Sequence, residues 1–117
     1  MSSIQRQESN AKLSRVVIHN GVAWLAGVAP ADCSQDIAGQ TRQTLARIDE
    51  VLALAGTDRQ RLLSVQIWMS DMARDVDAMN AEWTTWLGDA GRPARATCQA
   101  AFDDPDLLVE IIVTAAV

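Results

Sequence analysis

The chain has 117 residues, 49% of them hydrophobic and 21% charged, which favours a single globular domain over residues 1–117. Its 15 acidic residues outnumber its 10 basic ones, and the basic residues are scattered, so the charge balance argues against a general RNA or DNA partner. The chain has one histidine and two distant cysteines, which argues against a zinc or iron site and against a disulfide framework. It has no long apolar run, which argues against a membrane span.

The first 27 residues predict a polar start followed by a β-hairpin. The opening MSSIQRQESN lacks the apolar centre of a signal peptide, which favours a cytoplasmic protein. Two apolar runs follow, and between them lies Asn20-Gly21, the dipeptide that suits a tight type I′ turn. Strands are therefore expected at about 15–19 and 22–27.

A long amphipathic helix is expected next. Apolar or small residues recur at three- and four-residue spacing from Ile37 to Ala55. Ser34 or Asp36 is expected to cap the start of this helix, and Gly56 follows its end, where a left-handed residue is favoured.

The middle of the chain predicts a strand and a second helix. The segment LLSVQIWM (62–69) alternates in polarity, with Leu63, Val65, Ile67 and Met69 expected on one face. After Asp71, apolar residues again step by three or four as far as Gly88, which is typical of a helix. The residues of this second pattern are Val76, Met79, Trp83, Trp86 and Leu87.

Two final strands are expected near 94–102 and 107–116, joined as a hairpin by the turn at 103–106. The predicted order is ββαβαββ, an α+β fold with two helices on one face of a mixed sheet. In the last strand, alternate residues from Val109 to Val117 are all apolar and suit the helices, but the other face, which carries Glu110, is also largely apolar. That second face needs a cover, and another copy of the chain is the expected one.

The second face is expected to carry polar and charged residues from three strands: Gln66, Trp68, Arg95, Thr97, Gln99 and Glu110. Alternation would then direct Cys98 to the opposite face. In a hairpin, Arg95 and Glu110 would lie about four positions out of register, about 13 Å apart, so they do not predict an ion pair within one chain. Buried charges need partners, which leaves two interpretations: ion pairs across a subunit interface, or a cleft for a small molecule.

Several segments resemble the Rid family, also called YjgF/YER057c/UK114, members of which are often labelled endoribonuclease L-PSP or translation inhibitor. They are LAGVAP, DIAGQTRQTLARIDEVLALAG, VQIWMSDM, MNAEW, RPARATCQA and VEIIVTAA, in the family order, and the resemblance covers about residues 13–117. It implies a chorismate-mutase-like fold assembled as a homotrimer, with the helices outside and three clefts between subunits.

The resemblance also implies an activity and its residues. The best-known activity of the family is hydrolysis of enamines and imines, such as 2-aminoacrylate, to 2-keto acids and ammonia, without a metal or organic cofactor. By position, the family's cleft arginine is Arg95, its water-positioning glutamate is Glu110, and its cleft asparagine and glycine are Asn80 and Gly27. Two further cleft positions, often serine and cysteine in the family, carry Ala26 and Thr97.

These residue types suit the chemistry. A guanidinium offers a rigid fork to a carboxylate, so Arg95 would hold an imino acid and orient its C=N carbon. Glu110 would orient and deprotonate the attacking water and then return a proton to the departing ammonia. The substrate class would be small imino acids, with keto acids as products.

One departure from the family pattern leaves alternatives open. Many members have a tyrosine near the N-terminus that lines the cleft, but this chain has no tyrosine and reads SNAKLSR there. A second hypothesis is therefore a protein that binds small carboxylates or keto acids without chemistry. A third, suggested only by the older family label, is an RNA-cleaving translation inhibitor, and the acidic charge balance argues against it.

Overall fold

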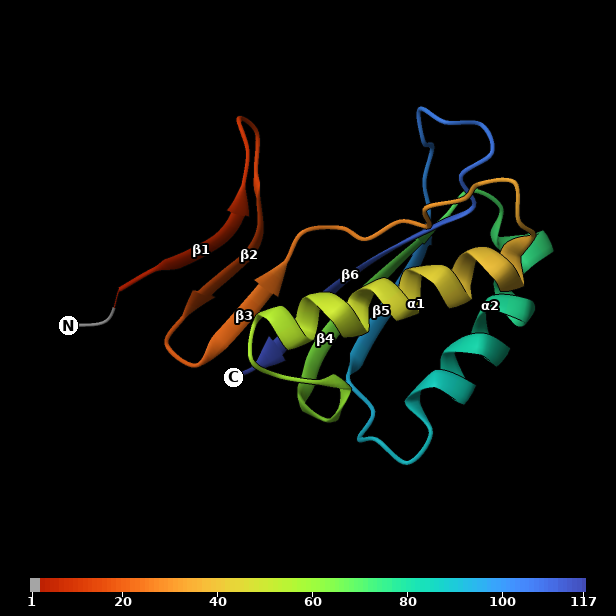
Figure 1. Ribbon diagram of the computed structural model, residues 1–117. Helices are drawn as coiled ribbons and strands as arrows, with labels where there is room; N and C mark the ends of the chain where they lie inside the picture. The colour runs from red at the N-terminus through yellow and green to blue at the C-terminus, as the bar shows by residue number, and fades with distance from the viewer. Residues whose placement is uncertain (1–2) are drawn as a thin grey trace.

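A computed structural model describes residues 3–117 and shows two helices packed on one side of a six-stranded sheet (Figure 1). The sheet order is β1-β2-β3-β6-β4-β5, with β4 and β5 parallel and all other neighbours antiparallel. The elements are β1 (Gln5–Ser9), β2 (Ser14–His19), β3 (Val22–Leu25), α1 (Ile37–Leu54), the 3₁₀ turn η1 (Arg59–Arg61), β4 (Leu62–Met69), α2 (Met72–Leu87), β5 (Ala94–Gln99) and β6 (Val109–Ala116). The expected α+β fold, with two helices on one face of a mixed sheet, is confirmed.

The core lies between the helices and the sheet. Ile48 and Leu52 of α1 and Met79 of α2 are fully buried against the inward-facing residues of the central strands, Ile67 and Ile111 among them. Each such side chain contributes roughly 1.5–3 kcal/mol relative to leaving it exposed. Neither helix in residues 3–117 is long and apolar enough to cross a membrane.

The predicted helix ends and hairpin turn are confirmed. Asp36, one of the two expected caps, accepts a hydrogen bond from the Gly39 amide at 2.9 Å. Gly56 has φ +81° immediately after the end of α1, the left-handed conformation for which glycine is favoured. Asn20 and Gly21 have φ of +52° and +76° and join β2 to β3, as a type I′ turn requires.

Two features of the strands differ from the expected pattern. β1 was not expected, because its QRQES sequence has no apolar alternation, yet it pairs antiparallel with β2. In β4 the alternation fails at its start: Leu62 is buried, and Leu63 is 47% exposed. A register shift lies between Leu62 and Ser64, so Leu63 is the extra residue of a bulge.

The expected hairpin of the last two strands is wrong. β5 pairs parallel with one edge of β4, and β6 pairs antiparallel with the other edge, so β4 separates them. The physical reason is that α2 acts as the crossover of a β4–α2–β5 unit, which delivers β5 parallel to β4. The long connection 100–108 then carries the chain across to β6.

The change of partner also corrects the expected faces. Arg95, Thr97 and Gln99 of β5 are level with Val65, Ile67 and Met69 of β4, which face the helices. Cys98 is level with Trp68, which in turn lies opposite Glu110. Arg95, Thr97 and Gln99 were therefore expected on the wrong face, and so was Cys98.

The sheet face away from the helices is open. It carries Trp24, Trp68, Glu110, Ile112 and Thr114, of which Trp24 is 45% exposed and the other four are half-buried. No helix in residues 3–117 covers this face, which is called the open face below.

Candidate functional site

Glu110 lies on the open face, with its carboxylate directly against the backbone of Gly27. A Cβ added to Gly27 would stand 2.9 Å from Glu110 Oε2 and 3.0 Å from Glu110 Cδ. Such distances are too short for a side-chain carbon, so any residue other than glycine at position 27 would force the Glu110 carboxylate to move. These two residues, with the neighbouring Ala26, form what we call the Glu110 half-site.

An irregularity in the pairing of β3 with β6 creates this contact. Trp24 pairs with Thr114, and Val28 pairs with Ile111. Between these two pairs the chain advances four residues from Trp24 to Val28 but only three from Ile111 to Thr114. The extra residue lies at Ala26-Gly27. Ala26 uses its amide to donate to the Arg15 carbonyl at 3.0 Å, and Gly27 comes under Glu110.

Arg95 lies on the opposite face, where α2 holds its guanidinium. Arg95 Nη1 donates to Asn80 Oδ1 at 2.7 Å, and the guanidinium carbon stands 5.9 Å from the centre of the Trp83 ring. Asn80 and Trp83 are one turn apart on α2, so they reach the same side chain. Thr97 follows on the same face of β5, and its buried Oγ1 has no hydrogen-bond partner within residues 3–117.

We call Arg95, Asn80, Trp83 and Thr97 the Arg95 half-site. Arg95 itself is exposed at the sheet edge and lines a shallow hollow of about 290 Å³ with Gln66 and Ala96. A fixed but accessible guanidinium suits recognition of a carboxylate, since only one of its donors is engaged within residues 3–117.

The two half-sites are separated within one chain. Arg95 is level with Val65 of β4 and Glu110 is opposite Trp68, three positions further along, or about 10 Å at strand rise. They also project from opposite faces of a single sheet. The structure therefore unites Gly27 with Glu110 and Asn80 with Arg95, but one chain cannot bring both charges to one small ligand.

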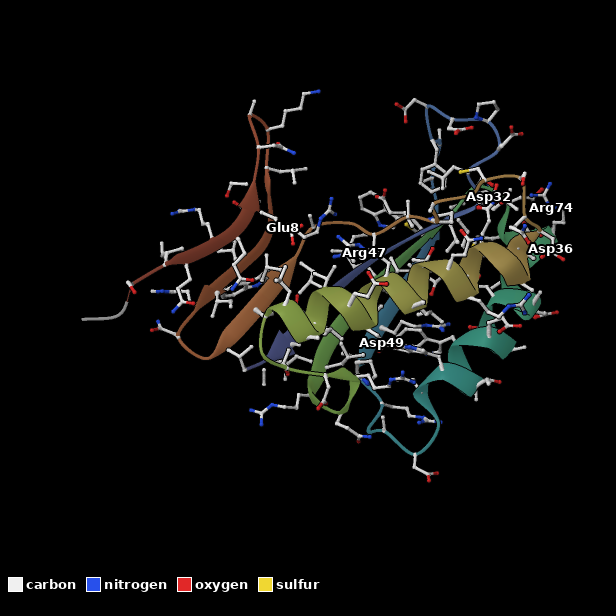
Figure 2. All side chains as sticks on the ribbon, viewed as in Figure 1. Glu8, Asp32, Asp36, Arg47, Asp49 and Arg74 are labelled. Atoms are coloured by element: carbon white, nitrogen blue, oxygen red, sulfur yellow. The ribbon has the colours of Figure 1, made fainter. Side chains whose placement is uncertain are left out.

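A larger hollow, of about 680 Å³, lies elsewhere and suits a carboxylate poorly. It is at the N-terminal ends of α1 and α2, where Figure 2 shows Asp36 and Arg74, and Asp71, Asp75 and Asp106 also line it. Arg74 is already engaged by Asp75 at 2.7 Å. In residues 3–117, no three His, Cys, Asp or Glu side chains lie together as a metal site would require.

The surroundings of this hollow also disfavour ionisation of the Cys33 thiol, which lines it. Partial burial, followed by the negative charges of Asp104, Asp106 and Asp32, raises the pKa of Cys33 above its usual value. A thiol with a raised pKa is mostly protonated and is a poor nucleophile.

The sequence did not predict the contacts that two residues, Trp83 and Arg15, make with the half-sites. The sequence placed Trp83 only in the apolar pattern of the second helix, and it is buried there, but it also contacts Arg95. Arg15 was not singled out, although its side chain reaches the Gly27 carbonyl at 3.3 Å. Its signal was a basic residue at the start of an otherwise apolar strand, SRVVIH.

Comparison with known proteins identifies the family of the chain. Residues 3–117 match the family model described as Endoribonuclease L-PSP. The chain belongs to this family. A RutC family protein of Haemophilus ducreyi is 39% identical over 114 residues, covering 97% of each chain.

Relatives in the family include a solved structure and a protein with a named activity. A YjgF-family protein from Neisseria meningitidis has a TM-score of 0.92 and 34% identity, covering 97% of this chain and 94% of the other. The protein named 3-aminoacrylate deaminase RutC, from Acinetobacter baylyi, is 30% identical over 98 residues, covering 79% of this chain and 76% of its own. The family and fold resemblance seen in the sequence is thus confirmed.

Proposed function

We propose that the chain is a cofactor-independent deaminase that hydrolyses small 2-imino acids, or their enamine tautomers, to 2-keto acids and ammonia. The observation that carries the proposal is the placement of Glu110, whose carboxylate is seated against Gly27 on an open face. The fixed guanidinium of Arg95 supports it, and so does the deaminase name of a family relative.

In the proposed reaction Arg95 binds the substrate carboxylate through the donors that Asn80 leaves free, while Asn80 and Trp83 hold the guanidinium in place. Glu110 accepts a proton from water, whose oxygen bonds to the imine carbon. Glu110 passes this proton to the imine nitrogen, which gives a neutral carbinolamine. Glu110 then takes the proton of the carbinolamine hydroxyl and delivers it to the nitrogen, the C–N bond breaks, and ammonia leaves as the keto acid forms. Water supplies the carbonyl oxygen, so no oxidant or reductant is consumed.

The proposal includes assembly as a homotrimer. Because Arg95 and Glu110 project from opposite faces, a cleft that uses both must take Arg95 from one chain and Glu110 from its neighbour. Ala26 and Thr97 would line such a cleft beside Gly27 and Asn80. In such a trimer the open face would be covered by another copy of the chain. The cytoplasmic location expected from the sequence stays a prediction.

Ammonia and keto-acid release tests the proposal. Imino acids would be generated in situ by an amino-acid oxidase, and their decay would be followed with and without the purified protein. We expect acceleration by the protein that is lost in both Arg95→Ala and Glu110→Ala, with the oligomeric mass unchanged. Turnover that persists in both variants would reject these roles.

The missing tyrosine favours one alternative, a protein that binds small keto acids without hydrolysing imines. It predicts saturable binding of pyruvate or 2-oxobutyrate with no acceleration of imine decay. RNA cleavage, which the family model's description suggests, is disfavoured by the net charge of −5. Cleavage of RNA by nuclease-free protein, lost in Glu110→Ala, would support that reading instead.

A further inference from the structure

Arg15 lies beside the Glu110 half-site and has no assigned role. In β2, Val16 is buried and pairs with buried Leu25, so alternation directs Arg15 to the open face. Its Nη1 donates to the carbonyl of Gly27, the residue whose other side touches the Glu110 carboxylate. A guanidinium and a carboxylate therefore flank one glycine on one face of one chain.

Arg15 forms no ion pair with a carboxylate of residues 3–117. It is half-buried, and within residues 3–117 no carboxylate lies within 4.0 Å of its guanidinium. The other arginines that form no ion pair there are exposed instead: Arg6, Arg61, Arg92 and Arg95. A charge partly removed from water normally requires a partner, so an unpaired half-buried guanidinium indicates an anion from outside the chain.

The carboxylate on the neighbouring strand β1 pairs with another arginine and not with Arg15. The β1–β2 register pairs Gln7 with Val16 and Ser9 with Ser14, which leaves Glu8 beside Arg15. Glu8, however, has φ +50°, an uncommon conformation for a glutamate, and its carboxylate lies 3.9 Å from Arg47 of α1. Figure 2 shows Glu8 and Arg47 facing one another between the hairpin and the helix.

We propose that Arg15 forms a second anion subsite, so that the preferred substrates are imino acids with two carboxylates, such as 2-iminosuccinate or 2-iminoglutarate. This inference rests on the proposed function and extends it to a substrate class. Arg95 takes the carboxylate next to the imine carbon, and Arg15 takes the carboxylate at the end of the side chain. The reaction is the same hydrolysis, giving a keto dicarboxylate and ammonia.

Arg15 also serves an electrostatic purpose in this arrangement. A second substrate carboxylate near Glu110 would be repelled by the Glu110 charge, and a neighbouring guanidinium offsets that repulsion. Arg15 has five N–H donors and uses one of them on the Gly27 carbonyl. The remaining donors include a pair that can bind both oxygens of a carboxylate.

The test compares Arg15→Gln with the wild-type protein on two imines, one from alanine and one from glutamate, each made by an oxidase of matching specificity. Loss of a charge-assisted bond is expected to raise KM for 2-iminoglutarate about tenfold. KM for 2-iminopropionate should change less than about twofold, and Arg15→Lys should recover part of the loss. Arg61→Gln is the matched control, because Arg61 also donates to one backbone carbonyl, that of Ala116 at 3.4 Å.

Binding of the product keto acids keeps the two proposals distinguishable. Calorimetric titration with 2-oxoglutarate and 2-oxobutyrate needs no turnover. If 2-oxoglutarate binds more tightly and Arg15→Gln removes the difference, the anion subsite stands even where no imine is hydrolysed. If imines are hydrolysed but neither class is preferred, the subsite is wrong and the deaminase remains.

Two further outcomes overturn the subsite. Equal losses on both imines in Arg15→Gln would mean that Arg15 holds the carboxylate beside the imine carbon. A shift of Arg15→Gln to smaller assemblies by light scattering, with affinity unchanged in the assemblies that remain, would mean that Arg15 pairs with a carboxylate of a neighbouring copy.

Discussion

At the scale of single residues, Gly27 shows how backbone geometry positions a reactive group. The carboxylate of Glu110 occupies the space that a Cβ of residue 27 would need. Gly27 therefore matters for its missing side chain, which leaves room for the Glu110 carboxylate, and not for a left-handed backbone, because its φ lies outside that region. The position of Glu110 is set by this contact and by pairing with Trp68.

Substitution of Gly27 by alanine should impair catalysis more than folding. The new Cβ would meet Glu110 Oε2 at 2.9 Å and push the carboxylate away from its seat. Displacement of a catalytic group by about 1 Å costs up to roughly 100-fold in rate, so kcat for imine hydrolysis should fall by at least about tenfold. Steady-state kinetics on 2-iminopropionate would measure the change, with thermal unfolding as the check on folding.

Gly91→Ala is the control for the Gly27 prediction. Residue 91 has no atom within 4 Å of an added Cβ and lies outside the left-handed region, so kcat should be unchanged. Equal activity of Gly27→Ala and Gly91→Ala would show that the seat of Glu110 on Gly27 is irrelevant to turnover.

At the scale of elements, the signals that succeeded are local ones. The helical periodicity from Ile37 to Ala55 became α1, and the Asn20-Gly21 turn joined β2 to β3, because each pattern satisfies its own hydrogen bonds within a few residues. The cap of α1 was narrowed to Ser34 or Asp36 from the sequence. The choice of Asp36 required the geometry, since Ser34 uses its hydroxyl on Asp32 instead.

Removal of the Asp36 cap should destabilise the protein without altering the half-sites. Asp36→Ala leaves the Gly39 amide without its acceptor, and loss of such a cap lowers the free energy of unfolding by about 1 kcal/mol. Asp36→Asn retains a capping oxygen and should stay close to the wild type. Urea unfolding at one fixed protein concentration measures both variants, and equal midpoints for Asp36→Ala and Asp36→Asn would contradict the capping role.

The features that the sequence did not predict depend on distant partners. β1 has polar residues on both faces and forms because β2 offers a free edge, which no pattern within QRQES reveals. The final hairpin was expected because a turn signal lies between the two strands, but the crossover through α2 outweighed it. Because β5 pairs with β4 and not with β6, Arg95 lies on the face of the helices and not on the face of Glu110. The alternation of residues within β5 cannot reveal this, because it does not say which strand is the neighbour.

At the scale of the whole molecule, the residues of the site were easier to predict than their arrangement. The resemblance selected Arg95, Glu110, Asn80 and Gly27, and the structure joins them as two pairs, Arg95 with Asn80 and Gly27 with Glu110. Their separation on opposite faces follows from sheet order, which is a property of the complete fold. Together with the uncovered open face, that separation is the physical reason to propose clefts that two chains complete.

Mixed assemblies give a direct test of clefts shared between chains. Arg95→Ala and Glu110→Ala subunits should each be inactive alone, since every cleft lacks one group. In a trimer that contains both variants, roughly one cleft in three pairs an intact Arg95 with an intact Glu110 from the neighbour. Coexpression with two different affinity tags, followed by purification on both, should therefore restore imine hydrolysis to about a third of the wild-type rate.

The control replaces the Glu110→Ala partner by the double variant Arg95→Ala/Glu110→Ala. Mixed with Arg95→Ala subunits, it supplies no intact Arg95 to any cleft, so these assemblies should remain inactive although they carry both tags. Recovery with Glu110→Ala but not with the double variant can come only from groups on different chains. Absence of recovery in verified mixed trimers would mean that the two residues do not meet across subunits, and the opposite faces of the sheet would then exclude their joint action altogether.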